Sequence, residues 1–201
     1  MKSFPTANQL SGRAIGAMFF AGFGTGWFFL APVAKQRITL ATVSAVLLGM
    51  LFLFLTAFYL LRQSSRWPRV PDDLAMRRTF AWINAIQWIA VFVVAFTLGR
   101  LNLDAYVISA ITAITAIIGM HMFPLARLFH YPLHYATGAV LVVWAVSSAM
   151  IVSVGQMQGI AALGTGLILW LSAAVTLGIA LQAARQPVPV LLAGQPGAEA
   201  I

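Results

Sequence analysis

The three histidines of the chain fall within one stretch, GMHMFPLARLFHYPLHY, which covers residues 119–135. His121 lies near the end of an apolar run, and His130 and His134 follow a few residues later. Imidazoles titrate near neutral pH, so these groups could relay protons or, together with Arg127, bind a phosphate or carboxylate. We therefore take Arg127, His130 and His134 as candidates for binding a lipid headgroup at a membrane surface. Interfacial anchoring without chemistry is the alternative.

A second set of polar side chains lies within or next to the apolar runs. Two pairs of these residues are each three positions apart, which puts both members of a pair on one helical face. If these side chains point to a common interior, they line a polar vestibule for a small solute. Amides in membrane helices also hydrogen-bond to neighbouring helices, and that role is the alternative for the amide pair. The ligand-lining candidates are Thr56 with Tyr59, Asn84 with Gln87, His121, and Tyr135.

Other kinds of chemistry lack the residues that they need. The chain has no cysteine, which excludes disulfides and thiolate chemistry. Its four acids lie in connections or in the C-terminal tail, so no carboxylate inside an apolar run could couple transport to protons or sodium. No acid lies close to the histidines in the sequence, and Pro132 interrupts the helical spacing between His130 and His134. We expect no metal ion and no other cofactor, and we favour a non-enzymatic function.

The composition indicates that these residues belong to a membrane protein. Of 201 residues, 61% are hydrophobic and 8% are charged, and the mean hydropathy is +0.92; a soluble domain has about a quarter charged residues. About 20 apolar residues form a helix that crosses a hydrocarbon core of roughly 30 Å. Continuous apolar runs read as helices because backbone groups in lipid must satisfy their own hydrogen bonds. The predicted spans cover residues 14–34, 38–61, 79–98, 105–123, 135–154 and 160–184.

The chain is therefore predicted to be a single membrane domain over residues 1–201, an all-α bundle of six transmembrane helices. The longest connection, 62–78, is a basic loop, and residues 186–201 are expected to form a flexible C-terminal tail. Two prolines restrict the backbone of residues 124–132, which we expect to be a bent connection at the membrane surface. The first apolar run superficially looks like a secretory signal, but its length favours a retained span.

The basic residues predict the orientation of the bundle. With six spans, both termini and the second and fourth connections lie on one side, which carries nine Lys and Arg residues against three on the other. The positive-inside rule places that side in the cytoplasm, so we expect a multi-pass protein of the plasma (inner) membrane with cytoplasmic N- and C-termini. The net charge of +8 then reflects topology. We expect no nucleic-acid partner, because no room is left for a folded basic surface, whereas the basic loop can attract anionic lipid headgroups.

Small residues recur four or fewer positions apart in the first and last spans. Such spacings let membrane helices approach each other closely. We interpret them as packing faces, either within the bundle or between protomers of a homo-oligomer. The glycines concerned are Gly12, Gly16, Gly22, Gly26, Gly164 and Gly166.

Three functions stay open on this basis. The favoured one is a small-solute permease or channel-like protein with a polar vestibule that faces the cytoplasm. The second is a lipid-headgroup-binding protein or membrane-embedded enzyme that uses segment 121–135. The third is an accessory or assembly subunit without chemistry of its own. The lipid bilayer is the partner expected in all three, and architecture alone does not choose among them.

Overall fold

The computed structural model describes residues 5–30, 39–71, 73–101, 110–151 and 154–186. In these ranges the secondary structure is helical and no strand occurs. Six helices are present in the described chain, and all six are long and apolar enough to cross a membrane, which confirms the prediction of six apolar helices. They are α1 (Ala7–Leu30), α2 (Leu40–Ser64), α3 (Leu74–Leu101), α4 (Ala110–Phe129), α5 (Leu133–Ile151) and α6 (Val154–Ala184).

Local polar residues set where two of these helices begin. Thr6 and Gln9 form a capping box at the start of α1: the Gln9 N–H donates to Thr6 Oγ1, and the Thr6 N–H donates to Gln9 Oε1, both at 3.2 Å. Asp73 Oδ1 accepts the N–H groups of Ala75 and Met76 at the start of α3. Both helices therefore begin before the apolar runs that predicted them.

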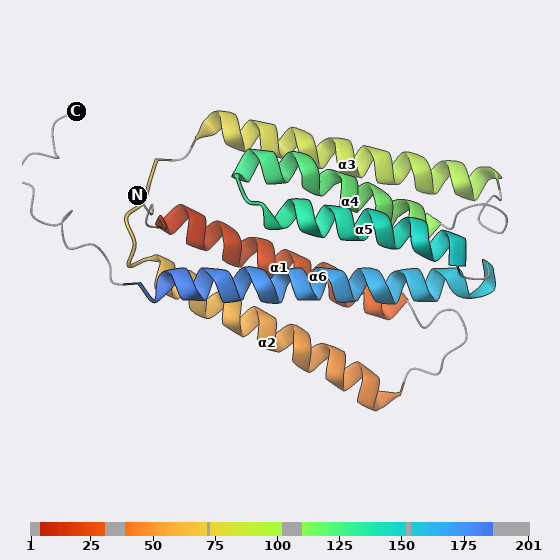
Figure 1. The fold of residues 1–201 in the computed structure, drawn as a ribbon, viewed down its shortest axis with the longest axis horizontal. Helices are drawn as coiled ribbons and strands as arrows, with labels where there is room; N and C mark the ends of the chain where they lie inside the picture. The colour runs from red at the N-terminus through yellow and green to blue at the C-terminus, as the bar shows by residue number, and fades with distance from the viewer. Residues whose placement is uncertain (1–4, 31–38, 72, 102–109, 152–153, 187–201) are drawn as a thin grey trace, which may run out of the picture.

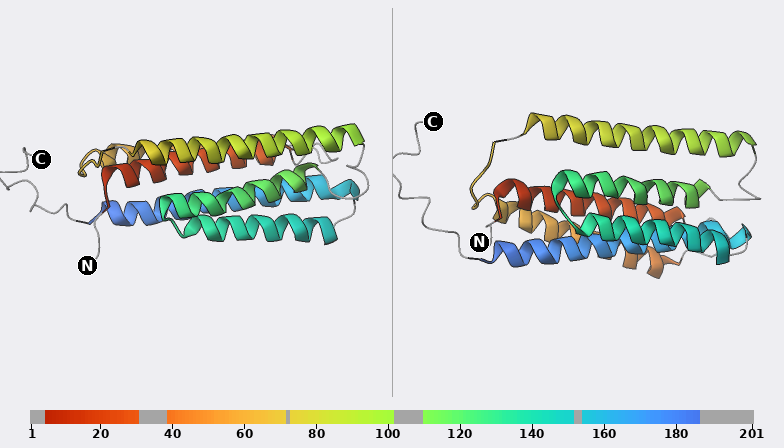
Figure 2. Two further views of the ribbon diagram at one scale, coloured as in Figure 1. Left: turned by 90° about the horizontal axis from the view of Figure 1, so that it is seen from above. Right: turned by 45° about the horizontal axis from the view of Figure 1, so that its top comes forward.

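The packing of the bundle centres on α6 and α1. These two helices make the most extensive contact in the molecule, and α6 also touches α2, α4 and α5. Helix α2 lies at one margin of the bundle and α3 at the opposite margin, next to α4 (Figure 1). Figure 2 shows the same arrangement from two further directions. None of the described side chains of α3 is buried, so the core lies among the other five helices.

Glycines allow the closest helix contacts. A Cβ atom added at Gly138 of α5 would lie 2.6 Å from the carbonyl oxygen of Gly119 on α4. On the other side of the core, a Cβ added at Gly24 of α1 would lie 3.0 Å from the carbonyl oxygen of Gly166 on α6. Both contacts bring backbone against backbone, which a larger residue would prevent.

The glycines singled out in the sequence differ in their surroundings. Gly166 takes part in the α1–α6 contact, and an added Cβ at Gly164 would strike the ring of Trp144. Gly22 lies at ordinary van der Waals distance from Phe54. A Cβ added at each of the remaining three would meet nothing within 4 Å, so these do not support close packing inside the bundle: Gly12, Gly16 and Gly26.

The connection between α4 and α5 is shorter than expected. Helix α4 continues through Pro124 to Phe129 instead of ending before the proline. The reversal occupies only three residues and begins at His130, whose φ of 49° is left-handed. Two hydrogen bonds close the turn, from the Tyr131 N–H to the Ala126 carbonyl and from the His130 N–H to the Arg127 carbonyl. This pattern is a Schellman motif, which ends a helix without needing a proline.

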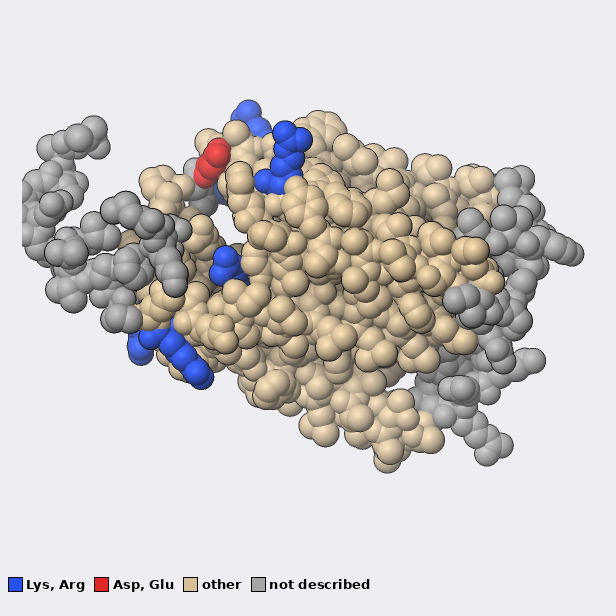
Figure 3. Space-filling view, in the orientation of Figure 1, with Lys and Arg blue, Asp and Glu red and all other residues tan. Residues whose placement is uncertain are grey.

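Charged side chains gather at one end of the molecule. On the face shown in Figure 3, the arginines lie at the end where α1 begins and α6 ends, and the rest of the described surface is uncharged. Arg100 of α3 lies at the other end of its helix. We call the first the arginine-rich end; its described arginines are Arg13, Arg62, Arg66, Arg69, Arg77, Arg78, Arg127 and Arg185.

Candidate functional site

Arg13 lies about two helical turns inside α1 and is half-buried. Its guanidinium carbon lies 4.9 Å from the centre of the Tyr131 ring, at the turn between α4 and α5. This is a cation–π contact, which holds the guanidinium over the ring face and leaves its N–H groups at the edges unused. No hydrogen bond or ion pair joins Arg13 to another described residue.

One imidazole lies next to this pair, and a second lies close to the first. The His134 ring meets the Tyr131 ring edge to face, with centroids 5.1 Å apart, and it also contacts Phe20 of α1 at 5.9 Å. His121, one helix away on α4, is buried and lies close enough to His134 to interact with it electrostatically. Residues far apart in the sequence thus share one site because α1 packs beside the α4–α5 turn.

Thr176 lies at the same level of the bundle. On the antiparallel faces of α5 and α6, the hydroxyls of Thr137 and Ser172 are 2.9 Å apart. One turn closer to the arginine-rich end, those two faces carry His134 and Thr176. Gly24 of α1 lies against Gly166 of α6, and these two helices run in opposite directions. Arg13 and Thr176 lie a similar number of residues from this contact, toward the arginine-rich end, so they lie at the same level.

The polar groups of this site have unmet hydrogen-bonding capacity. Among the described residues, three buried side-chain atoms have no hydrogen-bond partner: Tyr131 Oη, His134 Nδ1 and Thr176 Oγ1. The one acid that the structure describes, Asp73, is occupied at the start of α3. A half-buried cation therefore lies beside hydroxyl and imidazole groups that can donate, with no described carboxylate to balance its charge. Partial removal of a charge from water without an opposite charge nearby is unfavourable, and a bound anion would offset that cost.

Buried hydroxyls continue from this site into the core. Helix α6 carries Thr165, Ser172 and Thr176 at spacings of seven and four residues, which places them on one face. The Thr115 hydroxyl of α4 lies 2.9 Å from that of Thr165, and each also lies within hydrogen-bond distance of a carbonyl of its own helix. These three residues form a line of hydroxyls along α6, in which Thr165 and Ser172 are paired with hydroxyls of α4 and α5.

The vestibule residues predicted on α2 and α3 do not meet. Asn84 and Gln87 of α3 are half-exposed and belong to the stripe of that helix that is turned toward the bundle, and Asn84 Nδ2 donates to its own helix at Phe80 O. Thr56 of α2 donates to Phe52 O, and Tyr59 is 55% exposed and accepts from Gln63. The two pairs lie on helices at opposite margins of the bundle, so no one cavity holds both (Figure 1).

The predicted headgroup residues also separate. Of the histidines near the turn, His134 belongs to the site, whereas His130 is exposed. Arg127 is exposed on α4 and makes no described contact with Tyr131. Tyr135 is 45% exposed and lies against the ring of Phe123, 6.1 Å away between ring centres. Of the candidates taken from the sequence, His121 and His134 are the two that the structure brings to this site.

Sequence reasoning missed Arg13, Tyr131 and Thr176 as members of one site. A local signal did exist for Arg13: the capping box TANQ at residues 6–9 starts α1 early enough to place Arg13 inside the helix. No such signal marks Tyr131 or Thr176, because their neighbours come from other helices.

Metal binding has no support in the described part of the chain, where no three His, Cys, Asp or Glu side chains lie close enough to share a metal ion. The arrangement instead suits an anion, held by a guanidinium and oriented by hydroxyl and imidazole donors. Comparison of the chain with protein-family models, with curated proteins and with solved structures gives no match.

Proposed function

We propose that the six helices span the plasma (inner) membrane, with the arginine-rich end and both termini in the cytoplasm. The length and apolar composition of all six helices support insertion. The orientation follows from the excess of arginines at that end, which the positive-inside rule assigns to the cytoplasm.

Within this arrangement the protein acts as a permease for a small anionic solute. The observation that carries the proposal is the half-buried Arg13 against the Tyr131 ring, with three unpartnered polar atoms at the same level of the bundle: Tyr131 Oη, His134 Nδ1 and Thr176 Oγ1. A carboxylate or phosphate between α1, α5 and α6 would accept hydrogen bonds from these groups. The line of hydroxyls from Thr176 to Thr165 supports a path deeper into the bundle, and its hydroxyl pairs would have to separate for the solute to pass.

The test measures uptake by proteoliposomes of radiolabelled acetate, succinate and inorganic phosphate. The expected result is saturable uptake of at least one of them by the wild type. Arg13→Gln should lower it by about tenfold or more, since a hydrogen bond to a charged group contributes roughly 1.5–3 kcal/mol. Arg127→Gln removes an exposed arginine from the same end of the bundle and is the matched control, with uptake unchanged.

Thermal stabilisation of the detergent-purified protein by the same three anions separates binding from transport. Stabilisation that Arg13→Gln abolishes, without uptake, would support the anion site and reject the permease. Equal uptake by wild type, Arg13→Gln and Arg127→Gln would reject the assignment of Arg13.

A further inference from the structure

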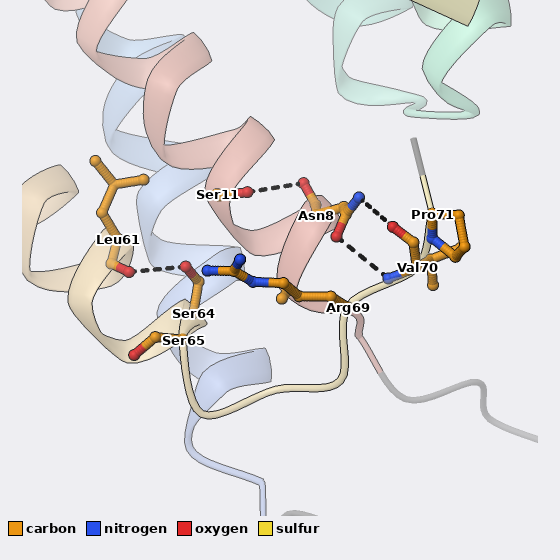
Figure 4. Close-up of a pocket in the computed structure, with 9 residues that line it drawn as sticks. Asn8, Ser11, Leu61, Ser64, Ser65, Arg69, Val70 and Pro71 are labelled. Carbon is orange, nitrogen blue, oxygen red and sulfur yellow. Dashed lines mark hydrogen bonds between the residues drawn. The ribbon is translucent and has the colours of Figure 1, made fainter. Parts of the chain in front are cut away.

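A polar hollow lies on the other side of α1 from Arg13, at the arginine-rich end. It is an open-sided cavity of about 700 Å³ between the first turns of α1, the last turns of α2 and the segment that follows α2. Figure 4 shows the side chains around it. Its lining residues are Ala7, Asn8, Ser11, Leu61, Ser64, Ser65, Arg69, Val70 and Pro71.

The wall formed by the segment after α2 is firmly attached to α1. The Asn8 side chain donates to the Val70 carbonyl at 2.8 Å and accepts the Val70 N–H at 3.4 Å. The Ala7 N–H donates to the Pro68 carbonyl at 3.0 Å, and the Trp67 side chain is 4% exposed. These contacts fix the wall of the cavity in place, although the cavity lies at the surface.

The chemistry of this cavity suits an anion. The Arg69 side chain reaches across it, with the guanidinium beside Ser64 (Figure 4). Ser11, Ser64 and Ser65 add hydroxyl groups, which each donate to a carbonyl of their own helix and can be redirected. No described carboxylate lines the cavity. The positive end of the α1 dipole lies at the same place.

A separate apolar hollow lies further along the same two helices. It has a volume of about 400 Å³ and is lined by Ile15, Met18, Phe19, Gly22, Phe23 and Phe54. On α1 the lining positions of both hollows, residues 8, 11, 15, 18 and 22, alternate by three and four and so form one stripe. On α2, Phe54, Leu61 and Ser65 are seven and four residues apart and share a face in the same way.

This geometry matches an amphiphile. From Ser11 to Gly22 the helix rises by about 16 Å, close to half of a hydrocarbon core of roughly 30 Å. We propose that the α1–α2 face binds an anionic glycerophospholipid, with its phosphate at Arg69 and one acyl chain along the apolar hollow. The site lies on a different face of α1 from Arg13 and is independent of the proposed transport.

The test is native mass spectrometry of the detergent-purified full chain with three probes: long-chain phosphatidylglycerol, long-chain phosphatidylcholine and glycerol 3-phosphate. The wild type is expected to retain phosphatidylglycerol in preference to phosphatidylcholine. Arg69→Gln should weaken phosphatidylglycerol binding by about tenfold, as expected for the loss of one charge-assisted contact. The matched control, Arg66→Gln, removes an exposed arginine of the same segment that does not line the cavity, and it should bind as the wild type does.

Two results would overturn the proposal. Equal weakening by Arg69→Gln and Arg66→Gln would mean that the lipid responds to the general charge of this end and not to the cavity. Binding of glycerol 3-phosphate as tightly as phosphatidylglycerol would identify a site for a free phosphate compound, without a role for the apolar hollow. Both variants change exposed side chains, so we expect both to fold as the wild type does.

Discussion

His130 takes a backbone conformation that glycine would adopt more easily. Its φ of 49° lies in the left-handed region at the position of a Schellman motif where glycine is usual. That conformation costs an ordinary residue roughly 1–2 kcal/mol. Glycine avoids this cost, but its unfolded chain is more flexible, which lowers the stability of the folded state by about 0.5–1 kcal/mol relative to alanine. His130→Gly is therefore expected to raise the free energy of unfolding by about 0.5–1 kcal/mol.

This change can be measured by thermal or denaturant unfolding in detergent. His130→Ala keeps the Cβ atom and serves as the control, with no gain in stability. A destabilised His130→Gly variant would show that the histidine ring makes a contact that matters more than backbone strain.

The same residue scale shows what a sequence can reveal about the site. His121 was recognised because an ionisable group inside an apolar run is rare. Arg13 was assigned to a flanking segment because the predicted span began at residue 14, whereas the capping box starts α1 at Ala7. Tyr131 and Thr176 join the site only through helix packing, which periodicity and hydropathy do not encode.

At the scale of helices, the closest backbone-to-backbone approach at a described glycine joins α4 and α5. Gly138→Ala would place a Cβ atom 2.6 Å from the Gly119 carbonyl oxygen, and backbone atoms cannot yield as a flexible side chain can. We expect this substitution to lower the free energy of unfolding by about 1–3 kcal/mol, the usual cost of overpacking. Unfolding measured by SDS titration provides the check.

Gly178→Ala on α6 is the matched control, because an added Cβ there meets nothing within 4 Å. Alanine favours the helix over glycine by about 1 kcal/mol, so this variant should be as stable as the wild type or more so. Equal destabilisation by the two substitutions would contradict a specific contact at Gly138.

The helices themselves were predictable where the signal is local. Apolar length identified all six, since a long apolar run is a property of neighbouring residues. The end of α4 was misjudged because Pro124 was expected to break the helix, yet the helix runs past it. The spacing of the glycines in the sequence also does not distinguish Gly166, which lies against α1, from Gly16, where an added Cβ atom would meet nothing within 4 Å.

At the scale of the whole molecule, the orientation in the membrane can be tested with reporters at the C-terminus. The excess of arginines at the end where α6 finishes predicts that this end faces the cytoplasm. Green fluorescent protein fused to the C-terminus should fluoresce, and alkaline phosphatase fused there should be inactive. The reverse result would place the arginine-rich end outside and remove the proposed cytoplasmic access to Arg13.

Helix α3 has a consequence for how the membrane acts on this protein. It packs on α4 and buries none of its described side chains, while Trp82, Ile89 and Phe92 are each more than 60% exposed. In a bilayer, lipid would therefore contact most of its circumference, and a mismatch between bilayer thickness and helix length would act on a tilt that its packing on α4 otherwise sets. Because Asn84 and Gln87 lie on its inward stripe, a change in this tilt would move two amides relative to the α4 face on which the helix packs.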